Sequence, residues 1–205
     1  DGGVDQVIGR GLATFLPGLQ GESKKACLAQ LNRYLTLVLE KNKVMNLTAI
    51  RIPEEAALRH IVDSLTLLSL QCIHSGDRIL DIGSGAGFPA APLAICTDCQ
   101  VTALDSVQKK VRFINESAEY IGLSNLTGLS GRAEELAHSE LRESFDIVTA
   151  RGVTKLRMLV EYALPFLKTG GCLLAMKGEA IAEEFEEAKT AINVLGGGEI
   201  QLKKV

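Results

Sequence analysis

From Ile79 onward, short apolar runs alternate with amphipathic stretches of helical periodicity. The apolar runs, each of which predicts a strand, are 79–82, 100–104, 126–130, 145–150 and 172–177. Apolar residues at helical spacing occupy 107–121 and 155–167 between them. Such alternation leaves few possible architectures, because parallel strands need crossover connections that are usually helices. It predicts an α/β fold with a doubly wound, Rossmann-like parallel sheet.

In a sheet of this kind, a ligand binds outside the carboxyl ends of the strands, at the point where the strand order reverses. The residues that end a strand or directly follow it are therefore the first candidates for ligand binding. They are 81–88, 105–106, 131–134, 149–152 and 177–178. The position of the site is thus predicted before any motif is considered.

The part of the chain before the sheet has the apolar spacing of helices. Two series recur at helical intervals: Leu28, Leu31, Leu35 and Val38, and then Leu58, Ile61, Leu65 and Leu68. Tyr34, and Tyr120 further along the chain, lie on apolar helical faces and are expected in the core, and Pro53 suits the first turn of the second helix. We therefore expect an N-terminal helical cap over 1–76 and a sheet domain over 77–205.

Composition limits the class of protein. The chain has 205 residues, a net charge of −3 and five cysteines. An odd number of scattered cysteines argues against a disulfide framework and for a reducing compartment. Because the sequence contains no run of about 18 apolar residues, we expect no membrane partner. The reducing compartment that the cysteines indicate leads us to expect a cytoplasmic protein. The acidic balance means that binding to nucleic acid would need a local basic patch.

The segment LDIGSGAGFP follows the first predicted strand and carries Gly83, Gly85 and Gly87. A P-loop would place Lys and then Ser or Thr after the last glycine, where Phe88 and a proline stand. A dinucleotide site would read G-x-G-x-x-G, whereas the spacing here is G-x-G-x-G. Asp81 would repel a pyrophosphate but suits a ligand with an ammonium group. The loop therefore favours S-adenosyl-L-methionine, which has an amino-acid tail, a sulfonium centre and no phosphate.

Two later strand ends agree with an adenosyl ligand. Asp105 ends the second predicted strand, where an acid can accept hydrogen bonds from both ribose hydroxyls. Ala133 and Glu134 follow the third strand, where the backbone and the carboxylate can address the exocyclic amine of adenine. Each signal alone has an ordinary explanation, since a glycine turn often only joins a strand to a helix and an Asp there often caps one. Their occurrence at three strand ends favours the adenosyl ligand.

Several segments together resemble one family. They are RILDIGSGAGFPAAPLAI, VTALDSVQKKVRFI, SGRAEE, FDIVTARGV and LPFLKTGGCLLAMKG, with NKVMNLTAIR and RHIVDS upstream. The chain resembles, over residues 30–205, bacterial small-subunit ribosomal RNA guanine-N7 methyltransferases, also called glucose-inhibited division protein B. The resemblance implies a class I S-adenosylmethionine-dependent methyltransferase with an N-terminal helical extension. Its target would be the N7 of a guanine in the 530 loop of 16S rRNA.

The resemblance also implies residue roles. It places cofactor contacts on Gly83, Phe88, Ala133, Glu134 and Arg151, and RNA contacts on Lys109, Arg132, Arg151 and Lys177. With the residues singled out above, the expected cofactor set is Asp81, Gly83, Gly85, Gly87, Phe88, Asp105, Ala133, Glu134 and Arg151. The partner would be 16S rRNA, in the 30S subunit or an assembly intermediate, and we expect a monomer.

Two features depart from the family pattern. Glu40 and Lys41 stand where the family often has a tryptophan shortly before NK. The family's last, antiparallel strand is expected beyond Val205. The second difference affects the expected sheet edge more than the expected site.

The implied reaction suits the residues present. Guanine N7 has a lone pair and no proton, so methyl transfer to it needs alignment rather than a general base. Arg151 follows an apolar strand, where an arginine without a role is costly to bury. We expect Arg151 to be catalytic by orienting the target base or the methionine carboxylate. Two segments are rich in basic residues, as RNA binding requires: SVQKKVRFIN and ARGVTKLR. Some of these basic residues are explained equally well as solvated positions on helix surfaces. The acidic segment GEAIAEEFEEAK should face away from RNA.

Other polar residues have simpler interpretations. Cys96 and Cys99 form an isolated C-x-x-C, which indicates a solvent-facing turn and no metal site. His60 and Asp63 lie one turn apart on a predicted helix, which favours a local structural pair over contact with RNA or cofactor.

Two alternative functions remain open from the sequence. One is a methyltransferase that acts on a small molecule or a protein, with activity that needs no RNA and is insensitive to salt. The other is a non-catalytic module that binds an adenosyl ligand or RNA and transfers no methyl group.

Overall fold

The computed structural model describes residues 2–178 and 181–204 and contains a five-stranded sheet in the order β3-β2-β1-β4-β5. The strands are β1 (Arg78–Ile82), β2 (Gln100–Asp105), β3 (Leu126–Ser130), β4 (Phe145–Arg151) and β5 (Leu167–Met176). All neighbouring strands pair in parallel, which confirms the predicted doubly wound sheet. Ile82 pairs with Leu104 on one side and Ala150 on the other, so the strand order reverses beside β1. The carboxyl ends of all five strands therefore meet at one edge.

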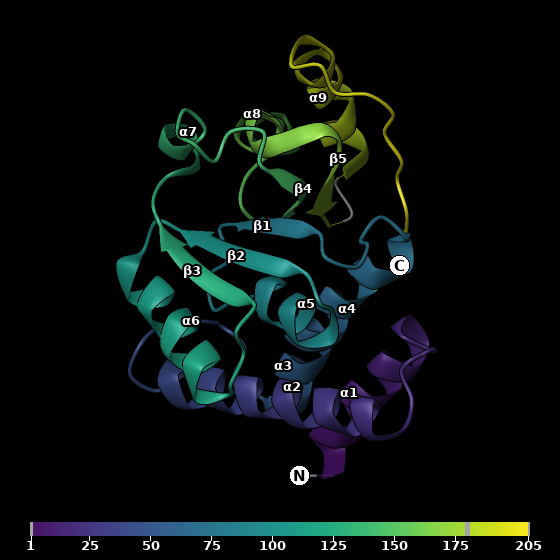
Figure 1. Ribbon diagram of the computed structural model, residues 1–205, viewed down its shortest axis with the longest axis vertical. Helices are drawn as coiled ribbons and strands as arrows, with labels where there is room; N and C mark the ends of the chain where they lie inside the picture. The colour runs from purple at the N-terminus through teal and green to yellow at the C-terminus, as the bar shows by residue number, and fades with distance from the viewer. Residues whose placement is uncertain (1, 179–180, 205) are drawn as a thin grey trace.

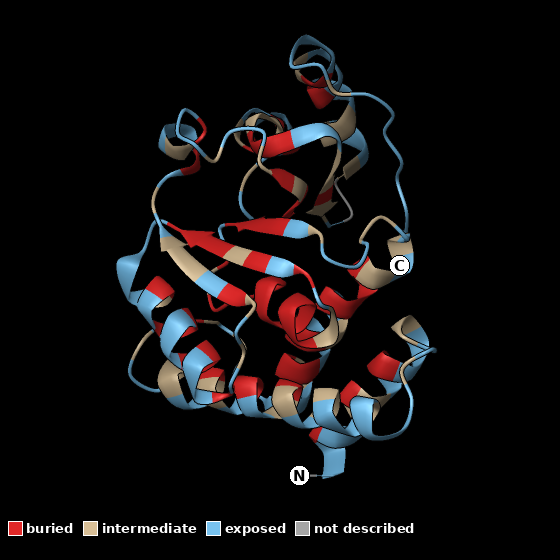
Figure 2. Cartoon of the chain, in the orientation of Figure 1, coloured by how far each residue is buried: buried red, intermediate tan, exposed pale blue. Residues whose placement is uncertain are grey.

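Helices cover both faces of this sheet (Figure 1). One face is covered by α5 (Ala90–Cys96), α6 (Gln108–Tyr120) and the N-terminal helices, which share a single apolar core. The other face is covered by α7 (Ala133–Leu136), α8 (Leu156–Ala163) and α9 (Ile181–Val194), which form a second core. Figure 2 shows the consequence: buried residues fill most of β1 and α5, as expected for a parallel sheet enclosed on both sides.

The N-terminal extension consists of two long helices and a run of short helical turns. They are α1 (Gly2–Phe15), α2 (Gly21–Asn42), α3 (Pro53–Ala56), the π-helical turn η1 (Ala57–Val62), α4 (Asp63–Leu65) and the 3₁₀ turn η2 (Thr66–Leu70). One apolar stripe of α2, with Tyr34 in its middle, is buried, and Pro53 lies in the first turn of α3 as predicted. The expected boundary at 76/77 falls in the turn before β1, and we keep that division as a proposal.

Two element boundaries differ from the prediction. The helix expected over 155–167 ends at Ala163, and a short 3₁₀ turn, η3 (Leu164–Phe166), follows it. Pro165 explains the change, because proline has no amide hydrogen to donate to the carbonyl oxygen of Glu161, four residues earlier. Strand β5 begins at Leu167 rather than at 172, and its pairing with β4 shifts register between Phe145 and Ile147. Residues 1, 179–180 of the acidic stretch, and 205 lie outside the described residues.

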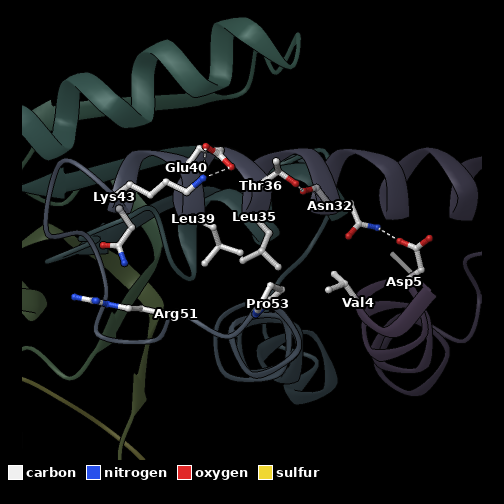
Figure 3. A pocket seen from close by; sticks show the side chains of 11 residues that line it. Val4, Asp5, Asn32, Leu35, Thr36, Leu39, Glu40, Lys43, Arg51 and Pro53 are labelled. Atoms are coloured by element: carbon white, nitrogen blue, oxygen red, sulfur yellow. Dashed lines mark hydrogen bonds and ion pairs between the residues drawn. The ribbon is translucent and has the colours of Figure 1, made fainter.

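A surface cavity of about 640 Å³ lies in the N-terminal extension (Figure 3). Leu35 and Leu39 of α2 and Pro53 line its apolar part, and Lys43 and Arg51 lie at one end. None of the residues expected to bind cofactor lines it. The candidate site is therefore sought at the strand ends, where the sheet topology places it.

Candidate active site

The glycine loop between β1 and α5 adopts a conformation that side chains rarely tolerate. Gly83, Gly85 and Gly87 have φ values of 66°, 61° and 94°. A Cβ atom on Gly83 would lie 2.8 Å from Val153 Cγ2, and one on Gly87 would overlap the Tyr34 hydroxyl. A Cβ atom on Gly85 would have no atom nearer than 4.0 Å. The outer two glycines therefore allow close packing, while Gly85 presents bare backbone to open space at the strand ends.

Tyr34 holds this loop from the N-terminal extension. Its buried hydroxyl donates a hydrogen bond of 2.8 Å to the carbonyl oxygen of Ala86. Its ring meets that of Phe88 edge-on, with centroids 5.7 Å apart and an interplanar angle of 89°. Burial raises the pKa of Tyr34, so the phenol stays protonated and remains a donor. The prediction that Tyr34 lies in the core is confirmed, and its contact with the loop is additional. The same prediction for Tyr120 is wrong, because this residue ends α6 and is 66% exposed.

Asp81, at the carboxyl end of β1, is fully buried beneath the loop. Ser84 Oγ donates to its Oδ2 at 2.5 Å, and Thr149 Oγ1 donates to its Oδ1 at 3.0 Å. Burial raises the pKa of Asp81 to about 6, although these hydroxyl bonds act in the opposite direction. The carboxyl group is thus poised to gain from a cation nearby, as its expected role beside an ammonium group requires.

Asp105, at the end of β2, fixes the loop from the other side. Its Oδ2 accepts a hydrogen bond of 2.8 Å from the backbone N–H of Gly85, and its Oδ1 accepts one of 2.9 Å from Val107 N–H. The carboxylate therefore joins the glycine loop to the beginning of α6. Its contact with ribose hydroxyls stays a prediction.

Arg151 ends β4 beside β1 and lies among residues of the extension and the loop. Its Nη1 donates to the carbonyl oxygen of Arg59 at 2.8 Å, and its Nη2 lies 3.1 Å from His60 Nδ1. Its guanidinium carbon lies 5.8 Å from the centroid of the Phe88 ring, a cation–π arrangement. Burial lowers the pKa of Arg151, while Asp63 and Asp81 nearby raise it.

His60 is part of this cluster, and the expected local pair with Asp63 is not among its hydrogen bonds. Its buried ring stacks on Phe88, with centroids 4.8 Å apart and an interplanar angle of 12°. Its Nε2 lies 2.8 Å from Thr48 Oγ1. Burial, and then the guanidinium of Arg151, lower the pKa of His60 to about 4, so the imidazole is neutral at physiological pH. The interpretation as a helix-surface pair is therefore wrong, because the helix is covered at this point by the loop and β4.

The remaining expected site residues lie at or beyond neighbouring strand ends. Ala133 is buried at the start of α7, and Glu134 beside it pairs with Arg132, with Nη2 and Oε1 3.0 Å apart. Lys109 is exposed on α6. Lys177 follows β5 and is largely buried, with its Nζ 2.9 Å from Glu184 Oε2 and also bonded to the carbonyl oxygen of Thr154. The structure thus brings Asp81, Gly83, Gly85, Gly87, Phe88, Asp105 and Arg151 together, and sets Lys109 and Lys177 apart from one another on α6 and after β5.

The cysteines differ from expectation in exposure. Cys99 is buried and Cys96 half-buried, so the predicted solvent-facing turn is wrong. A hydrogen bond from Cys96 lowers the pKa of Cys27 to about 7. Over 2–178 and 181–204, no group of three or more His, Cys, Asp or Glu side chains is arranged to hold a metal ion.

The fold and the strand-end site define the class of protein. A putative S-adenosyl-L-methionine-dependent methyltransferase from Methanococcus maripaludis is 15% identical, with a TM-score of 0.53 over 79% of this chain and 70% of its own. A SAM-dependent methyltransferase from Aquifex aeolicus is 20% identical, with a TM-score of 0.52 over 69% of this chain and 82% of its own. This chain has the class I S-adenosylmethionine-dependent methyltransferase fold.

Sequence similarity is more specific. The family described as rRNA small subunit methyltransferase G matches residues 27–205. Ribosomal RNA small subunit methyltransferase G of Desulforamulus reducens is 45% identical over 175 residues, 84% of this chain and 73% of that protein. The protein of the same name from Lachnoclostridium phytofermentans is 42% identical over 190 residues, 90% of this chain and 78% of that protein. The chain belongs to the rRNA small subunit methyltransferase G family, which confirms the resemblance.

Proposed function

We propose that this protein transfers a methyl group from S-adenosyl-L-methionine to the N7 of a guanine in 16S rRNA, in the 530 loop. The observation that carries the proposal is the bare backbone of Gly85 in the loop after β1, where the strand order reverses, in a chain of this family. S-adenosyl-L-methionine, when bound, supplies a methyl group activated on a sulfonium centre.

The residues at the strand ends suit this cofactor. A side chain at Gly85 would project into the open space before the loop, so the glycine keeps that space available. Asp81 supplies negative charge for an ammonium group, and Asp105 supplies carboxylate oxygens at the end of the neighbouring strand. The residues that we propose to hold the cofactor are Asp81, Gly83, Gly85, Gly87, Phe88, Asp105, Ala133, Glu134 and Arg151.

The protein's own part in the reaction is alignment. Guanine N7 carries its own lone pair, so no side chain has to remove a proton, and orientation can supply several kcal/mol of rate enhancement, up to about 10 in favourable systems. Arg151 is the proposed catalytic residue. Two of its nitrogens are engaged by η1, and its remaining N–H donors are available to orient the methionine carboxylate or the target base.

For the RNA, we propose contacts from Lys109, Arg132 and Lys177 in addition to Arg151. Lys109 and Arg132 are exposed, while Lys177 would have to leave its pair with Glu184 to reach a phosphate. The proposed partner is 16S rRNA within the 30S subunit or an assembly intermediate, bound by a monomer in the cytoplasm. Within 2–178 and 181–204, no helix combines the length and the apolar character needed to cross a bilayer.

The experiment that tests the proposal is transfer of a radiolabelled methyl group from S-adenosyl-L-methionine. The acceptors are 30S subunits from cells that lack this modification and naked 16S rRNA, each digested to nucleosides after reaction. Label in 7-methylguanosine is the expected result. If neither the 30S subunits nor the naked 16S rRNA are labelled while the protein still binds cofactor, the proposed acceptor is overturned.

Two variants test the role of Arg151. Arg151→Ala should lower the rate by about a hundredfold or more, because misplacement of the reacting groups is costly. The matched control is Lys155→Ala, which removes an exposed positive charge four residues further along. Equal rates for the two variants would remove Arg151 from the site.

A further inference from the structure

A chain of hydrogen bonds connects the exposed loop after α2 to Arg151. Asn42, the last residue of α2, accepts at Oδ1 from the backbone N–H groups of Leu47 and Thr48, at 2.8 and 3.0 Å. Its Nδ2 donates to the carbonyl oxygen of Thr48 at 2.9 Å. Both backbone groups of Thr48 are therefore held by one side chain. This fixes the place from which Thr48 reaches His60.

The chemistry of arginine decides which ring nitrogen of His60 carries the proton. Arg151 has only donors, so His60 Nδ1, 3.1 Å from Nη2, must be the acceptor. The ring proton then lies on Nε2 and is donated to Thr48 Oγ1, 2.8 Å away. Thr48 Oγ1 also accepts from the backbone N–H of Ile50 at 3.1 Å, which leaves it well supplied with donors. The network thus has one consistent direction, from His60 to Thr48 and from Arg151 to His60.

The π-helical turn η1 supplies two adjacent acceptors to the same guanidinium. Arg59 contributes its carbonyl oxygen to Nη1, and His60 contributes Nδ1 to Nη2. The ring of Phe88, on the glycine loop, lies under both the imidazole and the guanidinium. Two acceptors and one aromatic face define the plane of the Arg151 head group. π-Helical turns occur often at functional sites, and this one places both acceptors side by side.

We propose that His60 is a positioning residue, which holds Arg151 in the orientation needed for cofactor and base through its Nδ1 lone pair, with Thr48 fixing the tautomer. The proposal rests on the proposed function, in which Arg151 contacts the cofactor or the base. It extends the active site to η1 and the loop after α2, outside the methyltransferase sheet.

A matched pair of variants separates positioning from packing. The Oδ1 of His60→Asn can take the place of Nδ1 and still accept from Arg151, but its amide does not extend to Thr48. The amide of His60→Gln extends to Thr48 in the place of Nε2 and leaves Arg151 without that acceptor. Both variants lose the stacking on Phe88 and both introduce an amide. A purely structural role would therefore reduce activity in both to a similar extent.

The measurement is kcat and KM for methyl transfer to 30S subunits, with urea unfolding to compare stabilities. We expect kcat/KM of His60→Asn to exceed that of His60→Gln by about tenfold or more, since a hydrogen bond to a charged group is lost only in the latter. Thr48→Val should lower kcat/KM in the natural chain and have little effect in the His60→Asn background. Equal kcat/KM for the Asn and Gln variants, at similar stability, would overturn the inference.

Failure of the proposed function gives a different result. If the natural chain labels neither RNA, the acceptor is wrong, and the same two variants are then compared by calorimetric titration with S-adenosyl-L-methionine. Tighter binding by His60→Asn than by His60→Gln would support positioning of Arg151 toward the cofactor. Equal dissociation constants in that case would overturn the positioning role.

Discussion

Gly85 and Gly87 have similar backbone conformations and different surroundings, so alanine should affect them differently. Alanine at positive φ costs about 1–2 kcal/mol at either position. At Gly85 nothing is added to this cost, because the nearest atom to a new Cβ lies 4.0 Å away. At Gly87 the new Cβ would displace the Tyr34 hydroxyl, whose buried hydrogen bond to Ala86 would be lost. That loss adds about 1–3 kcal/mol, and the total becomes about 2–5 kcal/mol.

The assay combines urea unfolding with calorimetric titration of S-adenosyl-L-methionine. Gly85→Ala should lose about 1–2 kcal/mol of stability and bind cofactor at least about tenfold more weakly, because its Cβ enters the space before the loop. Gly87→Ala should lose more stability than Gly85→Ala. In a Tyr34→Phe background, the stability cost of Gly87→Ala should fall by about 1 kcal/mol or more, since the hydroxyl that it displaces is already gone.

Three results would refute this reasoning. Equal stability losses for Gly85→Ala and Gly87→Ala would mean that Tyr34 does not limit the loop. A cost of Gly87→Ala that is unchanged by Tyr34→Phe would mean the same, because the two changes would then be independent. Unaltered cofactor affinity of Gly85→Ala would place the ligand elsewhere.

Three further predictions concern charge and protonation. The folded-state pKa of Asp81, about 6, exceeds its ordinary value of 3.8, so the contribution of Asp81 to stability should fall as pH rises from about 4 to 6. Asp81→Asn should remove this contribution and raise stability at pH 7 by about 3 kcal/mol, and a stability difference between variant and natural chain that does not change with pH in urea unfolding would contradict it. Alkylation of Cys27 by iodoacetamide, followed by mass spectrometry over a pH series, should reach half its maximal rate near pH 7. Cys96→Ala should move that midpoint toward pH 9.0, and an unmoved midpoint would exclude the hydrogen bond from Cys96 as the cause of the lowered pKa. Lys109→Gln should weaken rRNA binding and reduce its salt dependence in filter-binding assays, and an unchanged salt slope would remove Lys109 from the RNA surface. Lys177→Gln should weaken rRNA binding as well, and it should also lower the melting temperature because Lys177 pairs with Glu184 in the free protein.

The sheet was predictable because its pattern is local. Each strand is a short apolar run and each crossover helix has its own apolar stripe, so periodicity alone identified four of the strands to within one residue at either end. The fifth strand was placed too late because Gly170 and Gly171 interrupt its apolar run. Gly170 has a φ of 83°, and regular pairing with β4 resumes only at Cys172, although the strand already begins at Leu167. Pro165 could have indicated the end of the preceding α-helix, because proline cannot donate the next helical hydrogen bond, but the apolar periodicity continues to residue 167.

The site was predictable only in part. The glycine spacing and the acids at strand ends can be read along the chain, and the topology brings them together. The contacts of Tyr34 with Ala86 and of His60 with Arg151 join residues 52 and 91 positions apart, and no periodicity indicates them. The motif RHIVDS did mark the segment of His60 as characteristic of the family, whereas Tyr34 lies outside both upstream motifs, and a motif does not indicate which atoms meet.

The extension supports the site from two independent elements. Tyr34 of α2 bonds to the backbone of the glycine loop, and His60 of η1 contacts both that loop and the end of β4. The conformations of the loop and of Arg151 therefore depend on the extension being packed in place. A ligand that binds only to the ordered loop is therefore coupled to this packing, and the coupling is reciprocal. The free energy by which the packing favours ligand binding equals the free energy by which the bound ligand stabilises the packing. Cofactor binding and docking of the N-terminal helices are thus expected to be coupled, although no helix of the extension carries a residue of the expected cofactor set.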